Sequence, residues 1–137
     1  MKFFTIILFF ILSVSPVLSE ENIKNSIESD KIEYLNETNE LKALGSVKIT
    51  REDYQLEADE VSFDQKNNII EGIGNVIIKE KSGSTILASK FKLSSDLSDG
   101  IIEMPTLLTK EGTEISSAYA IRSGSKSIVL KKGVFSP

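Results

Sequence analysis

Apolar and polar residues alternate along most of the chain after residue 26. Apolar pairs two positions apart recur at Ile32 and Tyr34, Val47 and Ile49, Val61 and Phe63, Val76 and Ile78, and Phe91 and Leu93. A period of two is typical of half-buried β-strands and fits these segments better than the helical period of 3.6. Polar segments that read as turns separate the strands, at residues 36–39, 64–68, 81–84, 94–100 and 123–126. The pattern predicts an all-β chain.

The alternation is organised in a repeat of about 29 residues. Segment 27–34 aligns with segment 56–63, and the register then continues without a gap, so that Gly45 matches Gly74. Further copies begin near residues 86 and 115. A two-strand repeat cannot bury its apolar face alone, so stacked copies must share one elongated core. We therefore expect a twisted antiparallel β-roll of about four two-strand repeats over residues 27–137.

One position in the repeat predicts a bend. In segment 56–63 the apolar parity changes between Ala58 and Val61, so the strand must bulge or turn a corner there to keep both residues inside. Asp30 and Asp59 lie beside this point in the first two repeats. Calcium binding needs a dense oxygen cluster, and glycoside hydrolysis needs two carboxyls across a cleft. The sequence designates neither, so we interpret both residues as polar positions outside the corner.

The first 19 residues predict a secretory signal peptide. They carry one lysine, an apolar run from Phe3 to Leu12 broken only by Thr5, and then Pro16 before a small residue at a plausible cleavage point. The run is shorter than the about 20 apolar residues that a membrane span needs. We expect export, followed by a flexible N-terminal segment over residues 20–26.

The amino-acid composition excludes most of the common catalytic mechanisms. The 137 residues include no Cys and no His, which excludes thiolate and imidazole catalysis, disulfides, and zinc sites built on these ligands. The net charge of −4 argues against nucleic acid as a partner. We expect no enzymatic activity, no cofactor and no metal site.

The apolar interior is then the remaining candidate site. Its expected inward-facing residues are Tyr34, Val47, Ile49, Val61, Phe63, Val76, Ile78, Phe91 and Leu93. If the roll stays open along one edge, these residues form a trough suited to acyl chains, because each buried methylene contributes about 0.8 kcal/mol. The alternative is an ordinary β-sandwich core, which alternating apolar residues also describe.

The repeat resembles a known family. Asp30-Lys31-Ile32-Glu33-Tyr34 followed by Gly45-Ser46-Val47-Lys48-Ile49, and the matching copy beginning at Asp59 and Gly74, are similar to the OstA-like domain of the lipopolysaccharide transport proteins LptA and LptD. The likeness covers residues 27 to 135.

The resemblance implies a periplasmic β-jellyroll that binds the acyl chains of lipopolysaccharide between its sheets. It also implies edge-strand pairing with other Lpt jellyroll proteins, in a path toward an outer-membrane translocon. The segment 130–137 resembles the end of this domain in LptD, so an LptD-like N-terminal domain is expected slightly ahead of a free-standing LptA-like bridge.

Two other functions stay open at the level of sequence. One is a structural β-repeat protein that self-associates through its edges and binds no lipid. The other is a polysaccharide enzyme using Asp30 and Asp59, which Ser89 at the matching position of the third repeat argues against.

Overall fold

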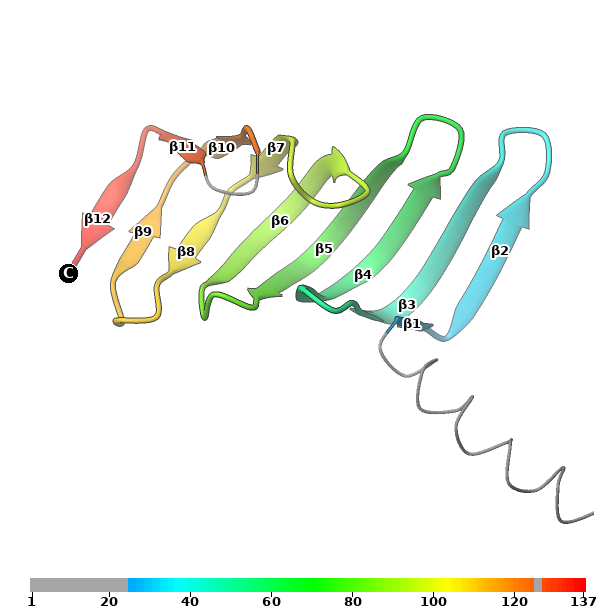
Figure 1. Ribbon diagram of the computed structural model, residues 1–137, viewed down its shortest axis with the longest axis horizontal. Helices are drawn as coiled ribbons and strands as arrows, with labels where there is room; N and C mark the ends of the chain where they lie inside the picture. The colour runs from blue at the N-terminus through cyan, green and yellow to red at the C-terminus, as the bar shows by residue number, and fades with distance from the viewer. Residues whose placement is uncertain (1–24, 125–126) are drawn as a thin grey trace, which may run out of the picture.

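The computed structural model describes residues 25–124 and 127–137, which form one antiparallel sheet of 12 strands (Figure 1). The strands are β1 (Ser26–Glu28), β2 (Lys31–Leu35), β3 (Glu40–Thr50), β4 (Tyr54–Asp64), β5 (Ile69–Glu80), β6 (Thr85–Ser94), β7 (Gly100–Glu103), β8 (Thr106–Leu108), β9 (Glu114–Ser116), β10 (Tyr119–Arg122), β11 (Ile128–Lys131) and β12 (Val134–Ser136). The predicted all-β class is confirmed. The expected signal peptide lies outside the described residues, as does most of the segment 20–26.

Each long strand bends in its middle. The pairing register shifts between Leu44 and Val47 in β3, between Glu57 and Glu60 in β4, and between Ile73 and Val76 in β5. The shift in β4 confirms the corner predicted from the change of apolar parity. Shorter strands are joined across the same line, so the chain makes eight bent passages: β1–β2, β3, β4, β5, β6, β7–β8, β9–β10 and β11–β12. Two passages form each of the four repeats.

Glycine and aspartate shape the bends of the first two repeats. Gly45 and Gly74 have positive φ angles of 81° and 83°, a left-handed conformation that a β-bulge requires and that glycine adopts without strain. Asp30 and Asp59 lie against these glycines from the neighbouring passage. The Asn75 side-chain amide donates a hydrogen bond of 3.0 Å to Asp59 Oδ2. The aspartates therefore belong to the corner, as the sequence pattern indicates.

The bends fold the sheet into two layers that face each other. Layer A comprises β2, residues 40–44, 60–64, 69–73 and 90–94, β7, β10 and β11. Layer B comprises β1, residues 47–50, 54–58, 76–80 and 85–88, β8, β9 and β12. All the connections between passages lie on the side away from the corners. We call this side the mouth.

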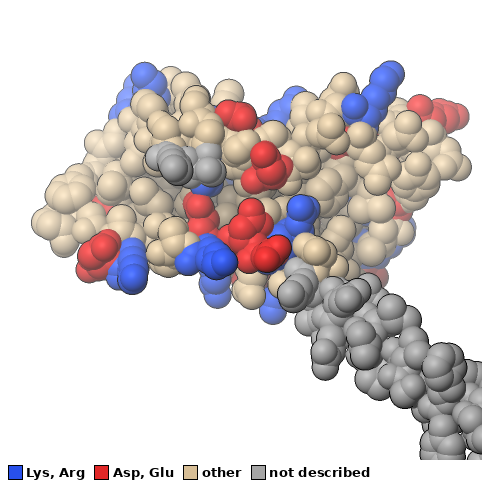
Figure 2. Space-filling view, in the orientation of Figure 1, with Lys and Arg blue, Asp and Glu red and all other residues tan. Residues whose placement is uncertain are grey.

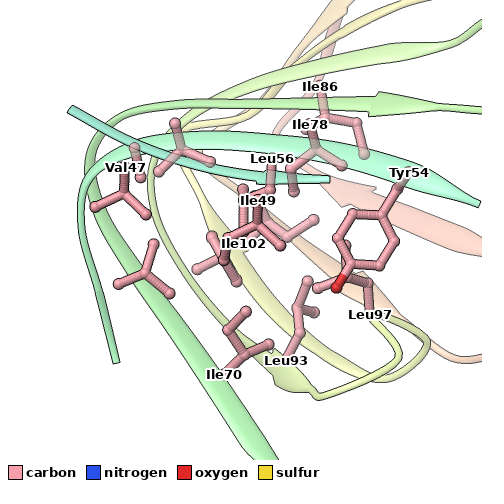
Figure 3. Close-up of a cluster of buried hydrophobic side chains, with 14 of the residues drawn as sticks. Val47, Ile49, Tyr54, Leu56, Ile70, Ile78, Ile86, Leu93, Leu97 and Ile102 are labelled. Atoms are coloured by element: carbon pink, nitrogen blue, oxygen red, sulfur yellow. The ribbon is translucent and has the colours of Figure 1, made fainter. Parts of the chain in front are cut away.

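A single apolar core fills the space between the layers (Figure 3). Layer B contributes Ile49, Leu56 and Ile78, and layer A contributes Ile70 and Phe91, each at most 1% exposed. Because strand partners in a ladder share a face, the core follows the sheet from one passage to the next. Any binding site inside the molecule must use this interior.

Candidate functional site

Inward-facing side chains form three rows that cross all eight passages. The first row is Tyr34, Leu41, Phe63, Ile70, Leu93, Gly100, Arg122 and Ile128. The second row is Ile32, Ala43, Val61, Gly72, Phe91, Ile102, Ala120 and Leu130. The third row, in layer B, is Ile27, Ile49, Leu56, Ile78, Ile86, Leu107, Ile115 and Phe135. The second and third rows have no charged or polar side chain and make a continuous apolar path through the interior, whereas Arg122 interrupts the first row near its end.

The nine residues expected to line the interior all lie on these inner faces. Val47, Ile49, Val61, Val76, Ile78, Phe91 and Leu93 are at most 2% exposed. Phe63 is half-buried against them, whereas Tyr34 is 51% exposed at the first passage. In the middle of the sheet the side chains fill the interior, so the lining of a lipid groove by these residues stays a prediction.

Sequence reasoning left out several residues of the same rows. Leu56, Ile70, Ile86 and Ile102 are fully buried beside the expected ones. The alternation of Tyr54, Leu56 and Ala58 carried a signal for Leu56, because all three face inward in layer B. Applying the same alternation of inward and outward residues along the full length of each strand would have identified all four residues.

The interior reaches the surface at both ends of the sheet. At the first passage Ile27, Ile32 and Tyr34 are 37%, 52% and 51% exposed, and at the last passage Phe135 is 62% exposed. A cavity of about 450 Å³ lies at the first end, lined by Asn25, Ser26, Ile27, Ile49, Arg51 and Phe63. The apolar path therefore has two open ends.

An ion pair joins the two layers at the mouth. Arg122 at the end of β10 in layer A donates to both carboxylate oxygens of Glu80 in layer B, at 3.0 and 2.8 Å. The Arg122 side chain is only 7% exposed, and that of Glu80 is 23% exposed. Such a bidentate pair is among the stronger polar contacts of a protein.

Two bulky side chains are buried at the mouth beside this pair. Leu97, in the connection 95–99 between β6 and β7, is 4% exposed, and Tyr54 at the start of β4 is 6% exposed. They lie next to each other in Figure 3, on the opposite side of the core from Val47. Burial raises the pKa of the Tyr54 phenol, and its hydroxyl has no hydrogen-bond partner among the described residues. The Arg51 guanidinium lies 5.8 Å from the centre of the tyrosine ring.

Side-chain hydrogen bonds hold the connection 95–99 in place. Asp96 Oδ1 accepts bonds from the Ser94 hydroxyl at 2.6 Å and from the Ser98 hydroxyl and amide at 2.7 and 3.1 Å. These bonds lower the pKa of Asp96 to about 2. Asp99 Oδ1 accepts a bond of 3.0 Å from the Gly124 amide. The segment is thus anchored on both sides of Leu97.

The surface offers little of the chemistry of a catalytic or metal centre. On the face seen in Figure 2, acidic and basic side chains are interspersed. Among the described residues, no cluster of three or more Asp, Glu, His or Cys could hold a metal ion. The described part of the chain also has no helix with the length and apolar character needed to cross a membrane. Asp30 and Asp59 lie at separate corners, each against a glycine.

The closing residues at the mouth had no sequence signal. Leu97 lies in a segment whose composition reads as a turn, and Glu80 and Arg122 are 42 positions apart. A period-two pattern assigns a residue to a face but does not say which side chains of the opposite layer it meets.

Comparison with known proteins agrees with the fold. The family model described as LptA/(LptD N-terminal domain) LPS transport protein matches residues 26–126. Among solved structures, the chain is similar to LptH, the LptA-homologous periplasmic component of the lipopolysaccharide transport device of Pseudomonas aeruginosa. The TM-score is 0.68 at 10% sequence identity, over 79% of this chain and 82% of LptH. The search of curated proteins gave no match.

Proposed function

The chain belongs to the LptA/LptD N-terminal family of lipopolysaccharide transport proteins, and from this premise we propose that it is a periplasmic conduit module that holds lipopolysaccharide acyl chains between its two layers. The protein would carry out no bond-breaking step. Its role would be to shield the acyl chains from water between one membrane and the next component.

The observation that supports this proposal most directly is the continuity of the rows of inward-facing side chains. Each row runs through all eight passages, and Ile27, Ile32, Tyr34 and Phe135 expose its ends. A structural core would need to be apolar only in the middle, whereas exposed apolar side chains at its ends oppose solubility. A path along which acyl chains move from one molecule to the next requires exposed ends of this kind.

The energetics favour tails over headgroups as the source of affinity. A buried acyl chain gains about 0.8 kcal/mol per methylene before the costs of binding, whereas an exposed ion pair contributes about 0 to 1 kcal/mol. At the mouth, the opposite charges of Glu80 and Arg122 neutralise each other, so the acyl chains and not the headgroup would supply most of the affinity. An acidic protein can therefore hold an anionic lipid.

The free edges of the sheet would supply the partners. The passages β1–β2 and β11–β12 each pair on one side only among the described strands, so both ends have unpaired backbone groups. We propose that these edges pair with the edge strands of other Lpt jellyroll proteins and of the outer-membrane translocon, so that the rows continue across the joint.

A photocrosslinking experiment tests the proposal directly. A benzophenone amino acid replaces Phe63 or Ile78 on the inner faces, and replaces Ser62 or Ile77 on the opposite faces of the same strands. Cells are irradiated, and adducts are detected with an antibody to lipopolysaccharide. We expect adducts at the two inner positions and none at the outer ones. Adducts of equal yield on both faces, or none at the inner positions, would refute it.

A structural, self-associating protein without lipid is the second candidate. The observation that favours it is the complete burial of the row residues in the middle of the sheet, as in an ordinary core. It predicts concentration-dependent oligomers that lipopolysaccharide does not change. Sedimentation velocity with and without lipid separates it from the conduit.

A further inference from the structure

We propose that the connection 95–99 is a gate in the mouth, with Leu97 as its plug and the Glu80–Arg122 ion pair as its strap, and that both must move aside for an acyl chain to enter between the layers. The inference rests on the proposed function, because it concerns how the same interior is reached.

The plug is a core side chain that comes from a connection at the mouth. Leu97 enters the interior at this end of the core and contributes to it at 4% exposure, although it belongs to a connection and not to a strand. An acyl chain has the same chemistry as the leucine side chain and could replace it there.

The strap lines two cavities that open at the mouth next to the plug. A cavity of about 250 Å³ is lined by Tyr54, Leu97 and both members of the ion pair. A second cavity, of about 160 Å³, is lined by the same pair and by Ile86, Leu107 and Ile128 from the inward rows. Both cavities are lined by the ion pair and by Ser82, so they lie side by side at the mouth.

Three features of the closed mouth are unfavourable and oppose the hydrogen bonds that anchor the connection. Leu97 has a φ of +63°, a left-handed conformation that is strained for leucine. The Tyr54 hydroxyl is buried and has no hydrogen-bond partner within residues 25–124 and 127–137, so folding costs it its bonds to water. Arg122 is removed from water, which offsets much of its attraction to Glu80. Opening relieves all three.

The first test removes the plug. Leu97→Gly deletes the side chain and relieves the backbone, and Met104→Gly is the matched control, because Met104 is also left-handed (φ 52°) but is 64% exposed near the corners. Uptake of lipopolysaccharide carrying a self-quenching fluorophore is followed by the rise in fluorescence. We expect Leu97→Gly to accelerate uptake by about tenfold or more, the factor expected from losing the burial of one leucine, and Met104→Gly to leave the rate unchanged.

The second test closes the strap covalently. The chain has no native cysteine, so Glu80→Cys with Arg122→Cys can be bridged by a reducible bis-maleimide. Glu71→Cys with Lys90→Cys is the control, because this pair bridges neighbouring strands on the outside of layer A. We expect the inner bridge to slow uptake at least tenfold and its reductive cleavage to restore the rate, with no effect of the outer bridge. The same molecules are compared before and after cleavage, which removes any effect of the substitutions on folding.

The outcomes separate the gate from the proposed function. If the wild-type chain takes up lipopolysaccharide but both the Leu97→Gly and the bridged proteins match its rate, the gate is wrong and the conduit stands. If the wild-type chain takes up none at equilibrium, the conduit is wrong and the gate falls with it.

Discussion

Gly72 in β5 shows how a single residue sets the packing of the interior. It faces inward beside Phe91, and a β-carbon at this position would overlap the buried phenylalanine ring. In the first repeat the matching residue is Ala43, whose row neighbours are Ile32 and Val61. The larger ring in the third repeat is thus accommodated by the smaller residue beside it.

We predict that Gly72→Ala destabilises the protein by about 1 to 3 kcal/mol, the usual effect of overpacking a closed core, and lowers Tm by several degrees. Thermal unfolding followed by circular dichroism measures the change. Gly133→Ala is the control, because its nearest neighbour to an added β-carbon is 3.6 Å away. Equal stability of Gly72→Ala and wild type would mean that the ring is not held as described.

The two glycines of the Gly72-Ile73-Gly74 segment show the reach of sequence reasoning at this scale. Two glycines this close together in a strand pattern, with no helix after them, are typical of a turn or bulge, and Gly74 is in the bulge. Gly72 instead lies within the strand, because Phe91 needs its space. That reason depends on a contact between strands, which the local sequence does not contain.

At the scale of the element, the corners of β3 and β5 each combine a left-handed glycine with an aspartate from the preceding passage. Asp59 is the side chain that a β-carbon at Gly74 would meet, and Asp30 plays the same part at Gly45. The recurrence of both residues at a spacing of 29 therefore reflects the geometry of the bend. This is why the corner could be predicted from the repeat and the parity change alone.

We predict that Gly74→Ala destabilises the protein by about 2 kcal/mol or more, because it adds the contact with Asp59 to a left-handed strain of about 1 to 2 kcal/mol. In the Asp59→Ala background the same substitution is expected to cost less by about 1 kcal/mol, since the obstructing side chain is gone. Urea unfolding of the four proteins of this double-mutant cycle measures the coupling.

Gly112→Ala is the control that measures the left-handed backbone strain alone, because Gly112 has a φ of 94° and no neighbour within 4 Å of an added β-carbon. Additive effects would exclude the contact.

The connection 95–99 contains a carboxyl group, Asp96, through which the stability of the protein should depend on pH. Hydrogen bonds from Ser94 and Ser98 lower the pKa of Asp96 to about 2 from its ordinary value of 3.8. The folded-state pKa lies below the unfolded one, so these bonds stabilise the protein above about pH 4 and lose their effect as the pH falls through about 2. Asp96 is exposed, so the contribution is screened and stays below about 1 kcal/mol.

We therefore expect Asp96→Asn to be less stable than wild type near neutral pH, and the difference to shrink as the pH is lowered toward about 2. Urea titrations at a series of pH values measure this difference. Glu111→Gln, at the exposed turn between β8 and β9, is the control. A difference that is independent of pH would assign the effect of Asp96→Asn to packing and not to its charge.

At the scale of the whole molecule, position in the sheet decides what equivalent residues do. Ile27 and Leu56 occupy the same place in successive repeats, yet Ile27 is 37% exposed and Leu56 is fully buried. The difference arises because β1 has a neighbour on one side only, whereas β4 lies between β3 and β5. The repeat predicts the inward face of both residues. It cannot predict their depth, which depends on how many passages cover them.

Self-association through the two exposed ends, which the second candidate function predicts, would be directional, because different residues project from each end. Ile32→Asp would disable the first end and Phe135→Asp the last, and each substitution is expected to weaken self-association by about tenfold or more through the lost burial of one large apolar side chain. Ile101→Asp, on the outer face at 50% exposure, is the control and should leave association unchanged.

A mixture of the Ile32→Asp and Phe135→Asp variants tests whether the contact is head-to-tail. In such a mixture one variant keeps an intact last end and the other an intact first end, so a head-to-tail contact should give one-to-one heterodimers and nothing larger. Sedimentation equilibrium of each variant and of the mixture measures this. Homodimers in either single variant would show instead that like ends meet.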